Sequence, residues 1–261
     1  MNGNYNQIIL VGHLPEKLIF SIDKETIHKI TLITEKQPLP GTPEAKKILN
    51  KLIKYYEERK VLVQTVEFDF HIQTKPIAEL IHFIYQQKLH GFDNITVNVS
   101  GGLRYMVIWL YIACSITNTR IIHGDFIYEG RKEVGIYSNM DLPTIHFQSI
   151  SDKQFEFLEL FFNTYSNYHD FFQPDISFND NPLLFKRNKY NSLEEIREAL
   201  QNKRNAALTR GSINGYIQKL SKISALKIYQ NPQDKKEKTI EISYLGIAYF
   251  LQKINEKKKI N

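Results

Sequence analysis

The sequence predicts an α/β fold with a mostly parallel sheet, followed by a smaller, mainly α domain. In residues 7–137, short apolar runs rich in β-branched side chains alternate with segments of helical periodicity. This alternation is typical of parallel strands joined by crossover helices. After residue 142 the helical pattern predominates and only one pair of short alternating runs remains. We therefore place the domains at residues 1–142 and 143–261.

The first domain contains six candidate strands. They lie at residues 7–12, 29–34, 61–70, 94–99, 120–128 and 132–138. The last two are separated by only three residues around Gly130, which predicts an antiparallel hairpin. The candidate helices between the other strands lie at residues 44–59, from near Pro76, and at 103–117, and right-handed crossovers would place them on both faces of the sheet. This is a Rossmann-like arrangement.

The second domain reads as helix, short helix, helix, two strands and helix. The predicted helices span residues 152–165, 192–200, a segment from Thr209 or Ser212 to about 222, and 244–253, and the strands span 226–229 and 239–242. Ser192 and Glu195 form a Ser-x-x-Glu capping box. This order is that of a winged helix-turn-helix with an unassigned loop-like insertion at 166–190.

Bulk properties set limits on the class of protein. Hydrophobic residues make up 42% and charged residues 24% of the chain, as in soluble proteins. No apolar run is long enough to span a bilayer, and the amino terminus lacks a secretory pattern. The single cysteine and eight scattered histidines show no metal-ligand spacing. We expect a cytoplasmic protein with no metal and no membrane partner. A net charge of +6 permits a polyanionic partner.

The most informative motif is the turn from Ser100 to Arg104. Gly101 and Gly102 separate a strand from an apolar helix, so the backbone can turn tightly and a ligand can approach it. The helix N-terminus favours an anion there, and Arg104 can reach a phosphate. A purely structural alternative remains open, in which Ser100 caps the helix and Arg104 is solvated.

A second glycine turn, at Gly12 and His13, ends the first strand. In the strand order 3-2-1-4 the first and fourth strands are neighbours, and ligands bind in the crevice where the topology reverses. The two turns should therefore lie side by side, with Thr34 and Glu35 as a possible wall. The predicted ligand-binding residues are Gly12, His13, Leu14, Thr34, Ser100, Gly101, Gly102, Leu103 and Arg104. The dinucleotide fingerprint, the phosphate loop and the Gly-x-Ser-x-Gly elbow are absent.

These residues resemble a known family. Residues 11–14, residues 98–106 and the carboxy-terminal winged helix are similar to those of the CRISPR-associated Rossmann-fold (CARF) transcriptional regulators. The resemblance implies a homodimer that binds a cyclic oligoadenylate, typically cyclic tetra-adenylate, across its two-fold axis, with no other cofactor. It also implies that the winged helices bind promoters of CRISPR-locus genes, and hence a role in antiviral defence. The insertion at 166–190 departs from the family pattern.

In a helix-turn-helix, the start of the second helix contacts base edges, and a basic wing contacts phosphates. The residues expected to contact double-stranded DNA are Arg204, Thr209, Arg210, Ser212, Asn214, Lys219, Lys235, Lys236 and Lys238. A winged helix used only for protein contact is the alternative. Gly215 within the predicted helix indicates either close packing or a misplaced helix boundary.

Two other functions fit the same motifs. A metal-independent ring nuclease would cleave the cyclic nucleotide in the sensor pocket, with His13, Ser100 and Arg104 as its catalytic candidates. A dimeric scaffold with a vestigial pocket would bind no nucleotide at all.

Overall fold

The computed structural model describes residues 4–71, 75–145, 147, 149–163, 188–230 and 238–258. Within these limits the chain divides into two compact units, Met1–Phe147 and Gln148–Asn261, and each is described by itself. Most of the predicted insertion, up to residue 187, lies outside the described residues, as do Lys235 and Lys236.

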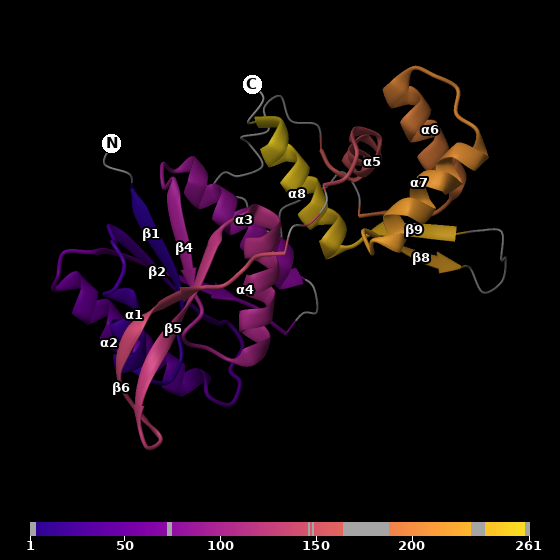
Figure 1. Cartoon of the computed structure of the whole chain (residues 1–261). Coiled ribbons are helices and arrows are strands. Elements are labelled where there is room, and N and C mark those ends of the chain that lie inside the picture. The colour runs from indigo at the N-terminus through magenta and orange to yellow at the C-terminus, as the bar shows by residue number, and fades with distance from the viewer. Residues whose placement is uncertain are drawn as a thin grey trace. The chain divides into compact units, whose positions relative to one another are not determined.

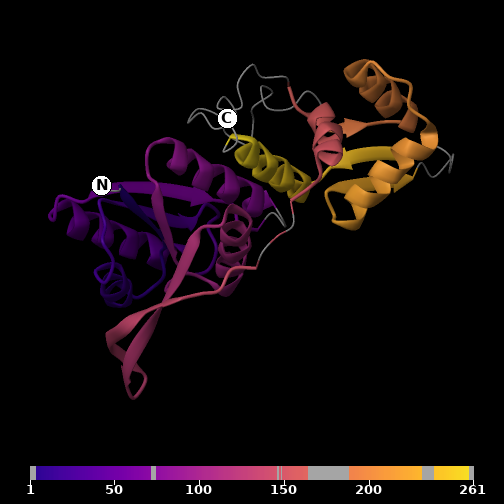
Figure 2. The same cartoon turned by 45° about the horizontal axis from the view of Figure 1, so that its top comes forward.

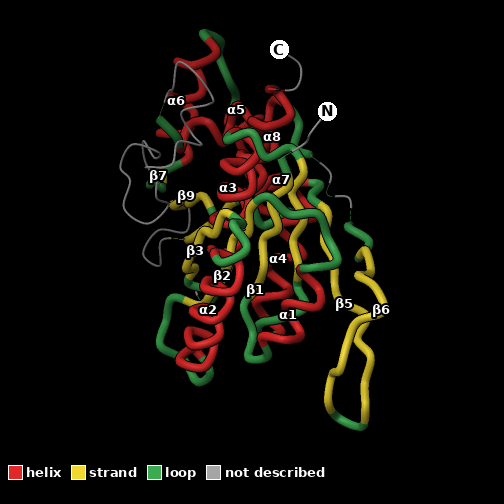
Figure 3. Tube along the Cα trace, turned by 90° about the vertical axis from the view of Figure 1, so that its left-hand side faces the viewer, coloured by secondary structure: helices red, strands yellow, loops and turns green. Residues whose placement is uncertain are grey.

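Unit 1 is built on a six-stranded sheet with the order β3-β2-β1-β4-β5-β6, which can be followed in Figure 3. The strands are β1 (Tyr5–Leu10), β2 (Lys29–Glu35), β3 (Leu62–Phe68), β4 (Asn94–Asn98), β5 (Arg120–Glu129) and β6 (Lys132–Asp141). The first five run parallel, and β6 pairs antiparallel with β5. The predicted mostly parallel Rossmann-like sheet, its 3-2-1-4 order and its terminal hairpin are confirmed.

Four helices cover the two faces of this sheet (Figure 1). They are α1 (Pro15–Ile22), α2 (Thr42–Glu57), α3 (Lys75–Leu89) and α4 (Arg104–Thr117). Helices α1 and α2 pack on β1 and β2 around fully buried Leu52 and Tyr56, and α3 packs with α4. All seven residues of β2 are buried, as expected for a parallel strand covered on both faces.

The β5–β6 hairpin continues past the rest of the sheet (Figure 2). Only residues 120–122 of β5 pair with β4, whereas the whole of β5 beyond Arg120 and Ile121 pairs with β6. Strand β6 ends at Asp141, three residues later than the alternation predicted. Tyr128 and Tyr137 are exposed on this hairpin.

The described residues of unit 2 form four α-helices and a small antiparallel sheet with the order β7-β9-β8. The elements are α5 (Asp152–Leu158), the 3₁₀ turn Glu159–Phe161, β7 (Lys189–Tyr190), α6 (Leu193–Arg204), α7 (Arg210–Lys222), β8 (Leu226–Gln230), β9 (Lys238–Ile242) and α8 (Tyr244–Lys258). The sequence missed β7, because two residues carry no periodicity and the partner strand β9 is distant in sequence.

The helix predicted over residues 152–165 is too long. It ends at Leu158, and the chain continues as a 3₁₀ turn. Leu160, Phe161 and Phe162 are all buried next to the helix end. A straight α-helix would direct some of these consecutive apolar side chains to solvent, so the change of helical geometry allows all of them to be buried.

Side chains cap the helices of unit 2. The hydroxyls of Ser151, Ser192 and Thr209 each accept a hydrogen bond from a backbone N–H in the first turn of the following helix. Thr209 is therefore the N-cap of α7, which decides between the two predicted starts. Asn205, in the left-handed conformation with φ of 49°, ends α6 later than residue 200.

Gly215 lies in the middle of α7, and a Cβ atom there would meet nothing within 4 Å. Neither close packing nor a helix boundary explains it. We expect Gly215→Ala to stabilise the protein by about 1 kcal/mol, because alanine loses less backbone entropy in a helix. Urea unfolding measures this change in the free energy of unfolding. A lower free energy of unfolding for Gly215→Ala would contradict the prediction and show that the folded protein requires glycine at this position.

Candidate functional site

The two glycine turns are in direct backbone contact. A Cβ atom on Gly12 would lie 2.8 Å from the backbone nitrogen of Gly102, and one on Gly101 would lie 2.4 Å from the Leu10 carbonyl oxygen. Gly102 also has a φ of +79°. The predicted adjacency of the turns is confirmed. The glycines are required for the turns to approach each other, in addition to any room they leave for a ligand.

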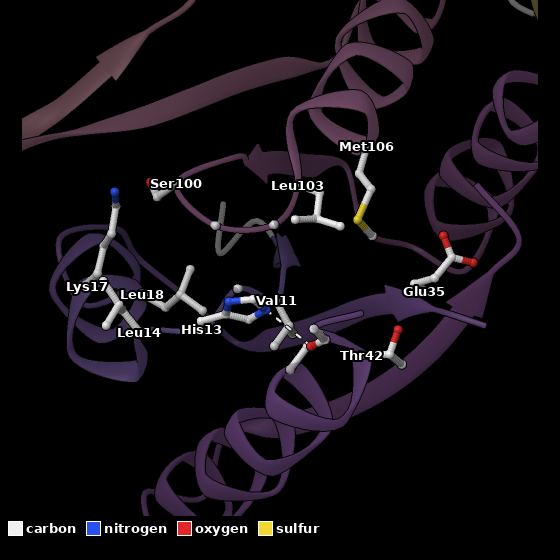
Figure 4. Close-up of a pocket in the computed structure, with 15 residues that line it drawn as sticks. Val11, His13, Leu14, Lys17, Leu18, Glu35, Thr42, Ser100, Leu103 and Met106 are labelled. Carbon is white, nitrogen blue, oxygen red and sulfur yellow. Dashed lines mark hydrogen bonds between the residues drawn. The ribbon is translucent and has the colours of Figure 1, made fainter. Parts of the chain in front are cut away.

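A pocket of about 180 Å³ opens beside these turns (Figure 4). It is lined by Val11, Gly12, His13, Leu14, Lys17, Leu18, Glu35, Gly41, Thr42, Ala45, Ser100, Gly101, Gly102, Leu103 and Met106. The structure thus gathers most of the predicted residues of the two turns around one cavity, at the carboxyl ends of β1 and β4. This is the switch point where strand order reverses.

Thr34 is not among the lining residues. Its side chain is buried within β2, with an exposed fraction of 2%, whereas the next residue, Glu35, lines the pocket. Successive side chains of a strand face opposite sides of the sheet, so the two residues cannot share one wall. Of the two residues that the sequence predicted for this wall of the pocket, only Glu35 lines it.

Arg104 lines an adjoining hollow rather than the pocket itself. This hollow, of about 450 Å³, is lined by Lys17, Val99, Ser100, Gly101, Gly102, Arg104, Val107, Ile108 and His123. It shares Lys17 and the glycine turn with the pocket. Arg104 is exposed and, within the described part of the chain, forms no ion pair. Its guanidinium is therefore available to an anion.

Three helix N-termini surround the pocket. Leu14, Gly41 and Leu103 are the N-caps of α1, α2 and α4, and no side chain of the described residues caps any of these helices. Each N-cap residue also lines the pocket. Uncapped N–H groups and the positive ends of three helix dipoles favour an anionic ligand. The helices of unit 2, by contrast, carry side-chain caps.

The hydroxyl of Ser100 belongs to a buried network. It accepts a hydrogen bond from the Gly124 N–H at 2.9 Å and lies 3.0 Å from the Ser21 hydroxyl. Ser21 donates its own hydrogen to Asn139 Oδ1 and accepts one from Asn98, so Ser100 donates to Ser21. Ser100 is therefore not the cap of α4. It ties the glycine turn to α1, β5 and β6.

His13 is held in one orientation by α2. Its Nε2 lies 3.1 Å from the Gly41 carbonyl oxygen, which can only accept, so Nε2 carries a proton. A Cβ atom on Gly41, which has a φ of +91°, would lie 3.0 Å from the imidazole. Glycine at position 41 thus provides both the backbone conformation and the space that place His13 in the pocket wall.

Lys17 and His123 are the two basic side chains that line the hollow together with Arg104. Lys17 forms an ion pair with Glu133 at 3.0 Å and lies 4.5 Å from the centre of the Phe126 ring. Burial and the nearby Lys17 ammonium lower the pKa of His123, so this imidazole is neutral at pH 7.

Several residues that line the two cavities were not predicted from the sequence: Lys17, Gly41, Thr42, Ala45, Met106 and His123. The sequence signal that could have identified Lys17 and Gly41 was their position at the starts of helices that follow the strands. Lys17 lies in the first turn of the helix that follows Gly12, and Gly41 precedes the predicted helix with Pro43 in its first turn.

In unit 2, most predicted DNA-contacting side chains lie along α7. Arg210 is 77% exposed and 3.5 Å from Glu194, an exposed pair that contributes little stability. Lys219 is exposed and Asn214 is partly buried, whereas Lys238 begins β9. Thr209 and Ser212 share a hydrogen bond at the helix start. The face of α7 that contains Ile213, Ile217 and Leu220 is buried.

Arg204, which was predicted to contact DNA, is paired within unit 2. Its guanidinium forms an ion pair with Glu156 at 2.9 Å, and a nitrogen lies 3.4 Å from the Tyr216 hydroxyl. Its side chain is only 15% exposed. Arg204 joins α6 to α5 and α7, so its charge is already satisfied within unit 2.

The described residues contain neither a candidate metal site nor a candidate membrane span. No group of three or more His, Cys, Asp and Glu side chains there has the arrangement of a metal site. None of the described helices combines the length and apolar character that crossing a membrane requires.

Three comparisons with known proteins complete the description. Among solved structures, protein VC1899 from Vibrio cholerae is 12% identical, with a TM-score of 0.38, over 95% of this chain and 64% of that one. A type III CRISPR defence DNA nuclease activated by cyclic oligoadenylate is 12% identical, with a TM-score of 0.39, over 88% of this chain and 36% of the nuclease. Can2 from Sulfobacillus thermosulfidooxidans, in complex with cyclic tetra-adenylate, is 13% identical, with a TM-score of 0.36, over 92% of this chain and 77% of Can2.

At TM-scores below 0.5, these likenesses decide neither fold nor ligand. The chain also spans less than two thirds of the first two structures. No curated protein matches it. Residues 6–128 match a family model described as "HFX_2341_N:-like, N-terminal". The matched segment runs from β1 into β5 and therefore contains every residue that lines the pocket and the adjoining hollow.

Proposed function

We propose that unit 1 is a sensor for a cyclic oligoadenylate and that unit 2 is a winged helix-turn-helix that binds double-stranded DNA. The protein would then act as a CRISPR-associated transcription regulator. The observation that carries this proposal is the convergence of three uncapped helix N-termini and two touching glycine turns on one pocket. Such a site suits phosphates, and the resemblance of residues 11–14 and 98–106 to CARF regulators supports the cyclic nucleotide.

The size of the site supports a homodimer. A pocket of about 180 Å³ is small for a ring of several nucleotides, and the hollow beside it remains open. Leu103 and Ile108, exposed by 39% and 54%, lie on α4 at the edge of these cavities. A second copy packed against α4 would cover these apolar side chains and present a second set of glycine turns to a symmetric ligand.

Three features support DNA binding by unit 2. Two helices, α6 and α7, are followed by the β8–β9 hairpin, as in winged helix-turn-helix domains. The exposed face of α7 presents Arg210, Ser212 and Lys219, and none of these side chains is needed to fill the core. The net charge of +6 favours a polyanion.

The direct test is a titration of the full chain with cyclic oligoadenylates of different ring sizes. Binding to duplex DNA from upstream of the protein's own gene is then measured with and without saturating nucleotide. We expect nucleotide binding and a DNA affinity that changes by about five-fold or more, as typical coupling free energies allow. Equal DNA affinity in both conditions would refute the regulatory part, and no nucleotide binding would refute the sensor.

Arg104→Ala should weaken binding of the cyclic nucleotide by about ten-fold or more. Its unpaired guanidinium can form a charge-assisted hydrogen bond with a phosphate, and such a bond contributes about 1.5–3 kcal/mol. Arg131→Ala removes an exposed arginine at the hairpin turn, outside both cavities, and is the matched control. Calorimetry that gives equal affinities for both variants would exclude Arg104 from the site.

The hydrogen bonds of Ser100 do not favour the ring-nuclease alternative. Its single proton is donated to Ser21, so it is not available as a donor to a leaving oxygen. The titration above also tests this alternative. Linear products after prolonged incubation would show that the pocket cleaves its ligand.

A further inference from the structure

The pocket has a second chemical character at the end away from the glycine turns. Figure 4 shows Lys17 and Ser100 at one end of the cavity and Glu35 at the opposite end. Lys17 and the N-termini of α1 and α4 favour negative charge at one end of the pocket, whereas the Glu35 carboxylate repels it at the other. A ligand that occupies the whole pocket must therefore present different chemistry to its two ends.

Glu35 is a buried carboxylate without a cation. Its exposed fraction is 5%, and no described lysine, arginine or histidine forms an ion pair with it. Its Oε1 accepts the Gln37 N–H at 3.1 Å, and its Oε2 accepts the Tyr105 hydroxyl at 3.4 Å. Two carboxylate oxygens offer about four acceptor positions, so capacity remains for donors from a ligand.

Tyr105 remains a donor across the physiological range. Burial and the neighbouring Glu35 carboxylate raise its pKa to about 12. Its hydroxyl also lies 3.2 Å from His71 Nε2, which fixes its position beside Glu35. The polar groups at this end of the pocket are thus oriented before any ligand arrives.

The walls between the two ends are mainly apolar. Val11, Leu103 and Met106 line the pocket between the glycine turns and Glu35 (Figure 4). Such walls suit the faces of a flat heterocycle better than a hydroxyl-rich sugar. The ring edge would then face Glu35, and a carboxylate there accepts from an exocyclic amino group.

From these observations we propose that Glu35 selects the nucleobase of the ligand by accepting a hydrogen bond from its exocyclic amino group. For an oligoadenylate this group is N6 of adenine. The inference rests on the proposed sensor function and adds to it the residue that distinguishes adenine from bases that carry a carbonyl at the same position.

The test compares cyclic tetra-adenylate with cyclic tetra-inosinate, in which a carbonyl oxygen replaces N6. The wild-type chain should prefer the adenylate by about ten-fold or more, because in inosine a carbonyl oxygen, which repels the carboxylate, takes the place of the amino donor at position 6. Glu35→Gln should reduce that preference to near unity, because its amide can donate to the carbonyl oxygen or accept from the amino group. Glu35→Asp keeps the acceptor and should retain the direction of the preference.

Glu67→Gln is the matched control, since Glu67 lies on the neighbouring strand β3, is about half exposed and lies outside the pocket. It should keep the wild-type preference. If Glu35→Gln binds with the wild-type ratio, or lowers both affinities equally as loss of a ribose contact would, the inference is wrong and the sensor remains. If the wild-type chain binds neither ring, the sensor function fails, and the inference fails with it.

Discussion

Gly101→Ala is expected to lose about 3 kcal/mol of unfolding free energy and, with it, most of the nucleotide binding. The added methyl group would lie 2.4 Å from the Leu10 carbonyl oxygen and 2.9 Å from the Gly12 nitrogen. Both contacts are with backbone, so no side chain can rotate away. Relief requires the ends of β1 and β4 to separate, and the turns that follow these ends line the pocket.

Gly130→Ala is the control for Gly101→Ala, because it introduces backbone strain without a steric clash. Gly130 has a φ of +64° at the tip of the β5–β6 hairpin, and a Cβ atom there would meet nothing within 4 Å. We expect a loss of about 1 kcal/mol from the left-handed conformation alone. Denaturant unfolding of both variants is the measurement. If Gly101→Ala costs no more than Gly130→Ala, the contact between the two turns is not what requires glycine.

Arg204→Met is expected to affect stability and Arg210→Met to affect DNA binding, although the two residues are only six positions apart and both were predicted to contact DNA. Arg204→Met should lower the unfolding free energy by about 2 kcal/mol, because it leaves the partly buried Glu156 carboxylate without its cation. Arg210→Met should leave stability unchanged, because Arg210 is mostly exposed and its ion pair is weak.

DNA binding should show the reverse order. Arg210→Met is expected to weaken duplex binding and to reduce the slope of log affinity against log salt by about one, whereas Arg204→Met should preserve that slope in the folded protein. Fluorescence anisotropy at several salt concentrations gives both values. Lys24→Met, an exposed change in unit 1, controls for the loss of one charge. If only Arg204→Met reduces the salt slope, then Arg204 and not Arg210 contacts DNA, and the prediction is wrong.

Local rules were sufficient for most elements. Periodicity located the six strands of unit 1 and, with the positions of Pro43 and Pro76, the helices α2, α3 and α4, because buried apolar residues must recur at the spacing of their element. Turn chemistry located the hairpin at Gly130, and the Ser192 cap located the start of α6, whereas the start of α7 was left between Thr209 and Ser212 until the structure showed Thr209 as its N-cap. The errors arose where burial was continuous, as after Leu158, or where an element was too short for periodicity, as in β7.

The residues of the candidate site were likewise predicted only in part. Gly12 and the Ser100–Arg104 turn were found because strand order and handedness place the carboxyl ends of β1 and β4 together. Gly41 and Lys17 were missed, because their proximity depends on how α1 and α2 start. Thr34 was chosen where Glu35 lines the pocket, a difference of one residue that strand alternation converts into opposite sides of the sheet.

The sequence by itself determined the mostly parallel sheet, its strand order and the position of the glycine turns, because these depend on periodicity, chain connectivity and handedness. Only the tertiary structure decided which side chains are available. Among the described residues, Arg104 has no ion-pair partner whereas Arg204 is paired with Glu156, and the Ser100 hydroxyl donates to Ser21. Pairing depends on contacts between residues far apart in the chain, and no local pattern in the sequence encodes such contacts.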